Sequence, residues 1–294
     1  MDKIGWLKFF EECGKKCYLP QMRRNWESRD YKNNQWDALC VFMSEYAFAR
    51  GGTNSPDYPA LSVYLLEKAK REGKQPSEEQ AGKIWEEWRK SGVGIPKKTT
   101  IPLDIRKDSN GGDRVSIIKF VSGISKKEGM SKTLPYYLKD VINNDGISKA
   151  HKELMRIVGV KEKIASFYLR DIVYELDVFD SFGNNIAGRE LLQPQDRWVN
   201  RITNKLFFDI DFYDKCSDNS KNMINQKTVI VAETIVKECN SNTNPEYVNM
   251  GMWYFGAVIV KSKFELDKLF KDLESRDDID KYCKERNWGV WLIE

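Results

Sequence analysis

The sequence predicts a mainly α-helical protein, and three observations support this class. Apolar residues recur at helical spacing through most of the chain. Ser77 stands three residues before Gln80, which is the pattern of an N-terminal capping box. Glycines follow several of the periodic segments, at the position where helices commonly end. We find no internal repeat and no low-complexity tract.

The first part of the chain contains three segments with a helical period. Residues 35–50 place Leu39, Phe42, Met43 and Tyr46 on one stripe. Helices are also expected over 59–72 and 77–90, each followed by glycine within two residues. Residues 93–113 are the least regular part, with two prolines and the turn sequence "DSNGGD", and are compatible with a short strand pair.

The second part of the chain continues the helical pattern. Residues 163–176 carry apolar side chains at the spacing of a buried helix face. Residues 177–193 predict a loop or a short extra element. The remaining expected helices cover 114–124, 133–143, 147–158, 196–208, 226–239, 245–260 and 263–275.

Composition limits the classes of protein that this chain can be. Its 294 residues, with 41% apolar and 12% aromatic side chains, suffice for one large domain or two lobes. No run of 18 apolar residues and no secretory signal occur, so we expect no membrane association and a cytoplasmic location, nucleoid-associated in a prokaryote. The six cysteines form no CxxC pair and His151 has no evident ligand partner, so we expect reduced thiols and no metal.

A glycine turn with two lysines, "IVGVKEKIA", lies between two expected helices. Residues 148–163 around it hold five basic and two acidic side chains, although the net charge of the whole chain is only +4. The unpaired first amides of the second helix, together with the positive end of its dipole, suit a nucleic-acid phosphate. Gly159 permits close backbone approach, Lys161 adds charge, and Lys163 lies where the dipole disfavours a cation. An ordinary αα-hairpin with exposed lysines is the alternative.

A second feature follows about thirty residues later, in "QPQDRWVNRI". Asp196 stands directly before an expected helix, after Pro194. As the N-cap, its carboxylate would accept backbone N–H bonds and stay ionised. A plain helix cap is the alternative reading of this residue.

The two features together resemble the helix-hairpin-helix DNA glycosylase superfamily, which includes endonuclease III and the 8-oxoguanine glycosylases. "GVKEKIA" is similar to the family's hairpin motif, so that Lys163 falls on its catalytic lysine and Asp196 on its catalytic aspartate. Lys161 replaces the second glycine of that motif. The long segment between the lysine and the aspartate looks most like the archaeal 8-oxoguanine DNA glycosylase branch.

A third segment, "NPEYVNMGMWYFGA", resembles the late helix that brings an acidic residue and a tryptophan to the flipped base in that branch. The matching positions here are Asn249 and Trp253, with an amide in place of the acid. An amide both donates and accepts, so this departure bears on the choice of base. Packing in the core is the alternative role for Trp253. The family's iron–sulfur loop is missing, as in its cluster-free branches.

The resemblance implies a two-lobed helical fold with the active site in the cleft between the lobes. Residues 36–195 would form the central lobe, with the hairpin at about 148–175, and residues 1–35 with 196–294 the second lobe. The chain would act as a monomer, without a cofactor, on double-stranded DNA that contains a damaged base. Gly159, Val160 and Lys161 would contact the DNA backbone.

The resemblance also implies a mechanism. The nucleotide is flipped into a pocket, where Asn249 and Trp253 read the base. Asp196 stabilises the positive charge that develops on the sugar, and Lys163 attacks C1′ to give a Schiff base that leads to strand scission. The lysine must be neutral, which requires desolvation and neighbouring positive charge.

Three alternatives remain open at the level of sequence. The chain could be a monofunctional glycosylase in which Asp196 activates water and Lys163 only contacts phosphate. It could be a catalytically silent hairpin module that binds DNA, or a helical scaffold that does not bind DNA. Damaged purine, with 8-oxoguanine as the leading candidate, is the substrate that the resemblance favours, and Asn249 leaves another modified base open.

Overall fold

The described part of the protein is helical throughout. The structure is a computed structural model, and it describes residues 1–46, 57–91, 112–128, 132–181, 187–208, 221–239, 243–273 and 275–285. Within these ranges every regular element is a helix and there is no strand, which confirms the mainly α prediction. Most of the irregular segment 93–113 lies outside the described residues. None of the described helices is long and apolar enough to cross a membrane.

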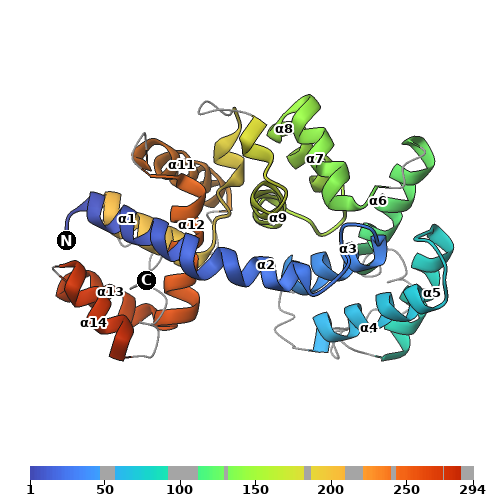
Figure 1. The fold of residues 1–294 in the computed structure, drawn as a ribbon, viewed down its shortest axis with the longest axis horizontal. Helices are drawn as coiled ribbons and strands as arrows, with labels where there is room; N and C mark the ends of the chain where they lie inside the picture. The colour runs from blue at the N-terminus through green and yellow to red at the C-terminus, as the bar shows by residue number, and fades with distance from the viewer. Residues whose placement is uncertain are drawn as a thin grey trace. The chain divides into compact units, whose positions relative to one another are not determined.

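The chain divides into two compact units (Figure 1). Unit 1 contains Met1–Arg24 and Arg189–Glu294, and unit 2 contains Asn25–Gly188. The resemblance predicts boundaries at 35/36 and 195/196, whereas those of the structure lie at 24/25 and 188/189. The first boundary of the structure falls inside a helix, α2 (Leu19–Glu27), so that no loop marks it in the sequence.

Unit 1 is built around the contact of its first helix with a late one. Its elements, besides the start of α2, are α1 (Lys3–Cys13), η1 (Gly14–Tyr18), η5 (Arg189–Leu192), α10 (Arg197–Thr203), η6 (Asn204–Phe208), α11 (Lys221–Cys239), α12 (Pro245–Tyr254), η7 (Phe255–Val260), α13 (Lys263–Asp272) and α14 (Arg276–Glu285). α1 packs along α12, and the aromatic rings of Trp6, Phe9, Phe10 and Phe255 interlock beside this contact.

Two glycines allow α1, η1 and α12 to pack backbone against backbone. A Cβ atom on Gly251 would lie 2.7 Å from the carbonyl carbon of Phe10 and closer still to its oxygen. A Cβ atom on Gly14 would lie 2.9 Å from the carbonyl carbon of Tyr247. Any side chain at either position would therefore force the two helices apart.

Unit 2 has α9 (Glu162–Glu175) at its centre, seen end-on in Figure 1. α7 (Leu134–Asp145), α8 (Ile147–Met155), η2 (Phe42–Tyr46) and η4 (Val178–Ser181) contact it. The predicted face of α9 is buried, since Ala165, Tyr168, Leu169 and Ile172 are fully inaccessible to solvent. The other elements are α3 (Gln35–Val41), α4 (Asp57–Arg71), α5 (Glu78–Ser91) and α6 (Gly112–Glu128).

A buried polar chain ties α9 to the start of unit 2. The Trp26 indole N–H donates to the Tyr46 hydroxyl at 2.9 Å, and that hydroxyl donates to the Asp171 carboxylate at 2.8 Å. The second oxygen of Asp171 accepts from Arg170 at 3.0 Å, and both of these charged side chains are almost completely buried. Because each charge has a hydrogen-bonded partner, burial of the pair is tolerated.

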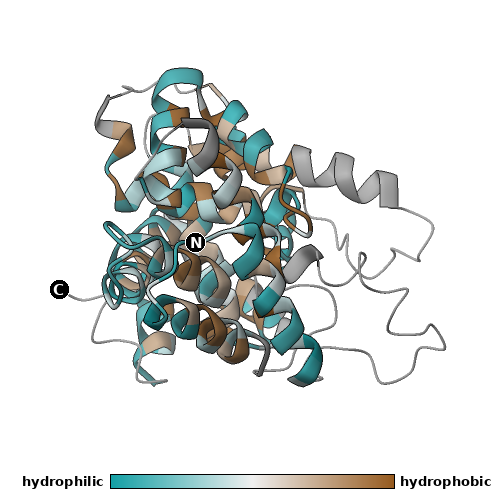
Figure 2. Cartoon of the chain, turned by 90° about the vertical axis from the view of Figure 1, so that its right-hand side faces the viewer, coloured by the Kyte–Doolittle hydropathy of each residue, from teal (hydrophilic) through white to brown (hydrophobic). Residues whose placement is uncertain are grey.

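Local signals in the sequence account for most helix ends. Ser77 accepts the Gln80 amide at 3.1 Å, so the predicted capping residue opens α5. Gly73, with φ of +70°, follows the end of α4. The expected loop at 177–193 contains two short 3-10 turns, η4 and η5. Figure 2 shows hydrophobic and hydrophilic residues alternating along the helices, as amphipathic helices require.

Candidate functional site

The predicted hairpin is formed by α8 and α9 in unit 2. α8 ends at Met155, and α9 begins at Glu162. Gly159 has φ of +87°, which only glycine adopts without strain, so it makes the reversal between the two helices possible. Val160 is 3% exposed, and its amide donates to the Ile157 carbonyl at 2.9 Å, so this residue anchors the turn to the core.

Side chains from both sides hold the hairpin in place. The Ser116 hydroxyl on α6 donates to the Val158 carbonyl at 2.8 Å. His151 on α8 lies 3.3 Å from the Ser166 hydroxyl on α9 through its Nε2 atom, and it also bonds to the backbone of Glu162. Burial lowers the pKa of His151, with the opposing hydrogen bond and charge of Glu162 smaller in effect. The imidazole is therefore a neutral connection between the two helices at pH 7.

The exposed rim of the hairpin carries the predicted lysines. Lys161 is the N-cap of α9, in an extended backbone conformation and without a side-chain capping bond. Lys161 and Lys163 are both exposed, and neither makes an ion pair with the part of the chain that the structure describes. On α8, by contrast, Glu153 pairs with Lys149 at 3.4 Å and with Arg156 at 2.8 Å. At the start of α9 the two lysines therefore flank the acidic Glu162, and no described ion pair holds either of them.

Asp196 is the N-cap of α10 in unit 1, as its place in the sequence predicts. One carboxylate oxygen accepts the amides of Trp198 at 2.8 Å and Val199 at 2.9 Å. The residue is half-buried, and its backbone is extended (φ −118°, ψ 177°). Two amide donors and the positive end of the helix dipole stabilise the ionised carboxylate at this position.

Residues 189–195 lead to Asp196, and we call this segment the strap. Hydrogen bonds connect the strap to α12. Glu246 of α12 is fully buried. It accepts three hydrogen bonds from the Arg189 guanidinium, at 2.7–3.1 Å, and one from the side-chain amide of Gln193 at 3.0 Å. Asn249, one turn further along α12, donates from Nδ2 to the Pro194 carbonyl at 3.3 Å. α12 therefore determines where the strap, and with it Asp196, lies in unit 1.

The two residues predicted to read a base have different environments. Asn249 has no solvent exposure, and its amide N–H is already bonded to the strap. Trp253 is half-buried and meets the ring of Tyr18 edge to face, with centroids 5.8 Å apart. Of the two, Trp253 is the one with accessible surface.

The structure thus arranges the predicted residues in two groups. Gly159, Val160, Lys161 and Lys163 share the hairpin of unit 2, and Asp196, Asn249 and Trp253 belong to unit 1. Sequence reasoning missed Glu246 and Arg189. A signal for Glu246 was present, because it stands three residues before Asn249 and therefore on the same helix face. Arg189, 57 residues away along the chain, gave none.

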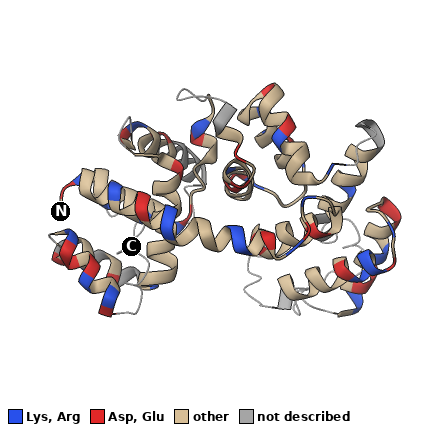
Figure 3. Cartoon of the chain, in the orientation of Figure 1, with Lys and Arg blue, Asp and Glu red and all other residues tan. Residues whose placement is uncertain are grey.

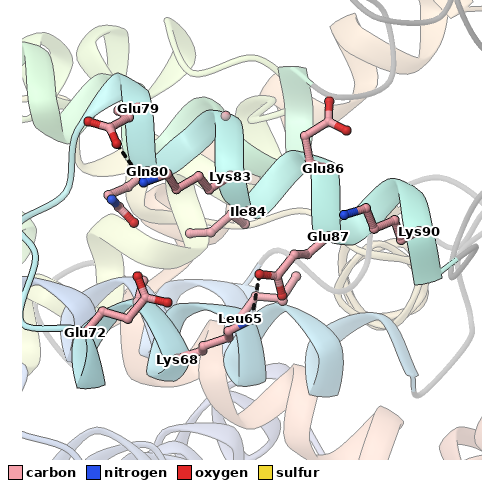
Figure 4. Close-up of a pocket in the computed structure, with 12 residues that line it drawn as sticks. Leu65, Lys68, Glu72, Glu79, Gln80, Lys83, Ile84, Glu86, Glu87 and Lys90 are labelled. Atoms are coloured by element: carbon pink, nitrogen blue, oxygen red, sulfur yellow. Dashed lines mark hydrogen bonds and ion pairs between the residues drawn. The ribbon is translucent and has the colours of Figure 1, made fainter.

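A separate groove of about 470 Å³ lies in unit 2 between α4 and α5. Figure 4 shows that its charged side chains pair across and along the two helices, with Lys68 bonded to Glu87 and Lys83 to Glu79, both at 2.7 Å. The hydrogen bonds to Glu87 and to Glu79 raise the pKa of Lys68 and of Lys83, respectively. Four of the charged side chains of the groove are thus paired with one another, and no predicted site residue lines it.

Charges elsewhere are also interspersed. Figure 3 shows blue and red residues alternating along α13 and α14 as well as along α4 and α5. Arg276 at the start of α14 bonds to Glu12 at 2.8 Å and to Asp280 at 3.0 Å. These helices resemble ordinary solvated surfaces, in contrast with the start of α9.

Comparison with known proteins gives one match. The chain is 24% identical to the uncharacterized protein MJECL21 of Methanocaldococcus jannaschii, over 87% of this chain and 67% of that protein. No family model matches the chain. No solved structure matches it either. An identity of 24% to a protein without an assigned activity leaves the function to be argued from the residues.

Proposed function

We propose that this protein is a helix-hairpin-helix DNA glycosylase that removes a damaged purine, 8-oxoguanine as the leading candidate, from double-stranded DNA. In this proposal it also cleaves the resulting abasic site through a Schiff base on Lys163. The observation that carries the proposal is the α8–α9 hairpin, with Gly159 at a positive φ and exposed lysines at the start of α9.

The hairpin has features that suit a phosphate of the DNA backbone. The start of α9 has no side-chain cap, so its first amides and its dipole are available to a phosphate. Lys161 and Lys163 add two positive charges beside Glu162, and no described ion pair holds either lysine. Contacts of this kind position a duplex without reading its sequence, which is what an enzyme that searches for damage requires.

Lys163 would be the nucleophile that attacks C1′. A neutral amine is required, and Lys163 is exposed, so the described residues do not desolvate it. In the proposed complex the flipped nucleotide supplies that desolvation. The reaction would then proceed only on the bound, extruded base.

Asp196 would stabilise the positive charge that develops on the deoxyribose. Its N-cap position supports this role, because the backbone amides of Trp198 and Val199 hold and orient the carboxylate. The proposal requires Lys163 and Asp196, which different units carry, to reach the same nucleotide in the complex with DNA. Trp253 would stack on the base, and Asn249 would hold the strap and contact the base only if its bond to Pro194 is exchanged.

Borohydride trapping on duplex oligonucleotides tests the proposal directly. Each duplex contains one altered base or an abasic site, and sodium borohydride converts a Schiff base into a permanent protein–DNA adduct. We expect an adduct on one lesion that disappears in Lys163→Gln and persists in Lys152→Gln, a matched surface lysine on α8.

Other outcomes would assign other functions. Alkali-labile sites without an adduct would make Asp196 the catalytic group of a monofunctional glycosylase and Lys163 a phosphate contact. Salt-dependent binding with no cleavage of any lesion would indicate a silent DNA-binding module. Absence of binding would refute the proposal altogether.

A further inference from the structure

The end of the α8–α9 hairpin exposes two large apolar side chains. Val158 is 57% exposed and Met155 is 38% exposed. Single exposed apolar residues are ordinary on a protein surface. These two, however, stand three positions apart in one hairpin, and they are two of the five large apolar residues that are exposed in the described part of the chain. We call Met155 and Val158 the apolar tip.

The packing of the hairpin does not account for the side chain of Val158. Its neighbours Ile157 and Val160 are buried and hold the turn against the core. Val158 itself contributes only its backbone carbonyl to the fold, which accepts the hydrogen bond from the Ser116 hydroxyl at 2.8 Å. Every residue type has that carbonyl, so the turn requires no apolar side chain here. The methyl groups of Val158 can therefore contact another molecule without disturbing the hairpin.

Positive charge borders the apolar tip. Residues 155–163 contain three basic side chains, Arg156, Lys161 and Lys163, and all three are exposed. Glu162 is the one acidic residue in this stretch, which leaves a net charge of +2. An apolar contact bordered by cations complements a partner in which anionic groups stand on either side of an apolar one.

A DNA strand has this alternation of charge and apolar surface. One deoxyribose lies between consecutive phosphates, so a surface that holds the phosphates by charge meets the C–H groups of the sugar beside them. In RNA the same sugar carries a 2′-hydroxyl, which a double helix displays in its minor groove. Pressing that hydroxyl against the methyl groups of Val158 would remove its water and supply no hydrogen-bond partner, which is unfavourable.

We propose that the apolar tip packs against the deoxyribose of a bound duplex and makes the hairpin select DNA over RNA. This inference rests on the proposed function, in which the hairpin holds the DNA backbone, and it adds the feature that distinguishes two nucleic acids with the same phosphate charge. Lys161 and Lys163 contribute affinity for both nucleic acids, because both carry phosphates. Val158 and Met155 contribute the difference between them.

A lipid surface also combines negative charge with an apolar layer, but it fits the apolar tip less well. The side chains of Val158 and Met155 together hold fewer carbons than one myristoyl chain, which by itself gives only marginal membrane binding. Electrostatic binding to anionic lipid uses clusters of roughly four to eight basic residues. The three basic residues of 155–163 fall short of such a cluster.

Binding of the full chain to two undamaged duplexes of the same sequence, one DNA and one RNA, tests the inference by fluorescence anisotropy. We expect wild-type protein to bind DNA about tenfold more tightly than RNA. Val158→Thr replaces one methyl group by a hydroxyl, which can bond to the 2′-hydroxyl. This variant should reduce the preference for DNA roughly fivefold, and Met155→Gln should reduce it in the same direction.

Two control variants separate apolar contact from charge. Lys161→Gln should weaken binding to both duplexes alike, and it should reduce the slope of log K against log salt for DNA by roughly 0.9. Ile4→Thr on α1 removes an equally exposed β-branched side chain from unit 1 and should leave the preference for DNA unchanged. Circular dichroism checks that each variant is folded, which we expect because the replaced side chains are exposed.

The outcomes distinguish this inference from the proposed function. If the protein bound DNA and the ratio of DNA to RNA affinity were the same in wild type, Val158→Thr and Met155→Gln, this inference alone would be overturned. Equal binding of wild-type protein to DNA and RNA would overturn it as well. Binding to neither duplex would overturn both proposals. If, in that case, vesicles containing phosphatidylserine bound the wild type and not Val158→Thr, the apolar tip would be a membrane contact.

Discussion

Replacement of Gly251 by alanine tests how closely α1 and α12 pack. The added Cβ atom would lie 2.7 Å from the Phe10 carbonyl carbon and 3.0 Å from the Gly14 amide nitrogen. Ordinary van der Waals contact begins at about 3.4 Å, and the Phe10 carbonyl oxygen lies closer still to the added atom, so the helices must separate by at least roughly 1 Å. Both neighbours are backbone atoms, so no side-chain rotation can relieve the overlap.

The cost of this separation is large because it affects the whole interface. A gap of roughly 1 Å removes about half of the dispersion attraction between facing atoms, and the aromatic rings of Trp6, Phe9 and Phe255 lie beside this contact. Overpacking of a core costs about 1–3 kcal/mol where side chains can adjust. We therefore expect Gly251→Ala to lower the free energy of unfolding by about 3 kcal/mol or more.

Urea denaturation followed by circular dichroism measures this change. Gly82→Ala on α5 is the matched control, because a Cβ atom at Gly82 meets no atom within 4 Å. Alanine has a higher helix propensity than glycine, so the control substitution should raise the free energy of unfolding by up to about 1 kcal/mol. If Gly251→Ala were as stable as the control, the close approach of α1 and α12 would be wrong.

Three further predictions concern the strap, the N-cap and the hairpin. Glu246→Ala should lower the free energy of unfolding of unit 1, measured in urea, by about 3–5 kcal/mol, because Arg189 and Gln193 lose their shared acceptor. The control is Glu190→Ala, a partly exposed residue of the strap, which should change that free energy by less than about 0.5 kcal/mol. Asn is also a good N-cap, so Asp196→Asn should keep a free energy of unfolding within about 0.5 kcal/mol of wild type while the proposed base excision is lost. If the variant lost stability and activity together, Asp196 would act only as a helix cap. Burial lowers the pKa of His151 in the folded state, so as the pH falls the unfolded chain takes up the proton first. The free energy of unfolding should therefore be unaffected by His151 above pH 6.5 and should decrease as the pH falls below it. His151→Asn should lack this decrease when unfolding is measured from about pH 7.5 to 5.

Local features of this protein follow from its sequence. The helical period predicts the buried face of α9, Ser77 and Asp196 predict the starts of α5 and α10, and Gly159 predicts the turn of the hairpin. Each of these depends on residues within a few positions of one another. Backbone sterics and short-range hydrogen bonds decide them before any distant segment packs.

Only the tertiary structure decided what the buried polar groups do. Asn249 is buried on α12, but its bond to Pro194 depends on a segment 55 residues earlier in the chain. The pairing of Glu246 with Arg189, the path from Trp26 through Tyr46 to Asp171, and the contact of Gly251 with Phe10 are likewise long-range. A helical pattern determines which side of a helix is buried, and it carries no information on which distant group lies opposite. That choice is made by close packing, because each buried polar group must find a partner among the segments that pack around it.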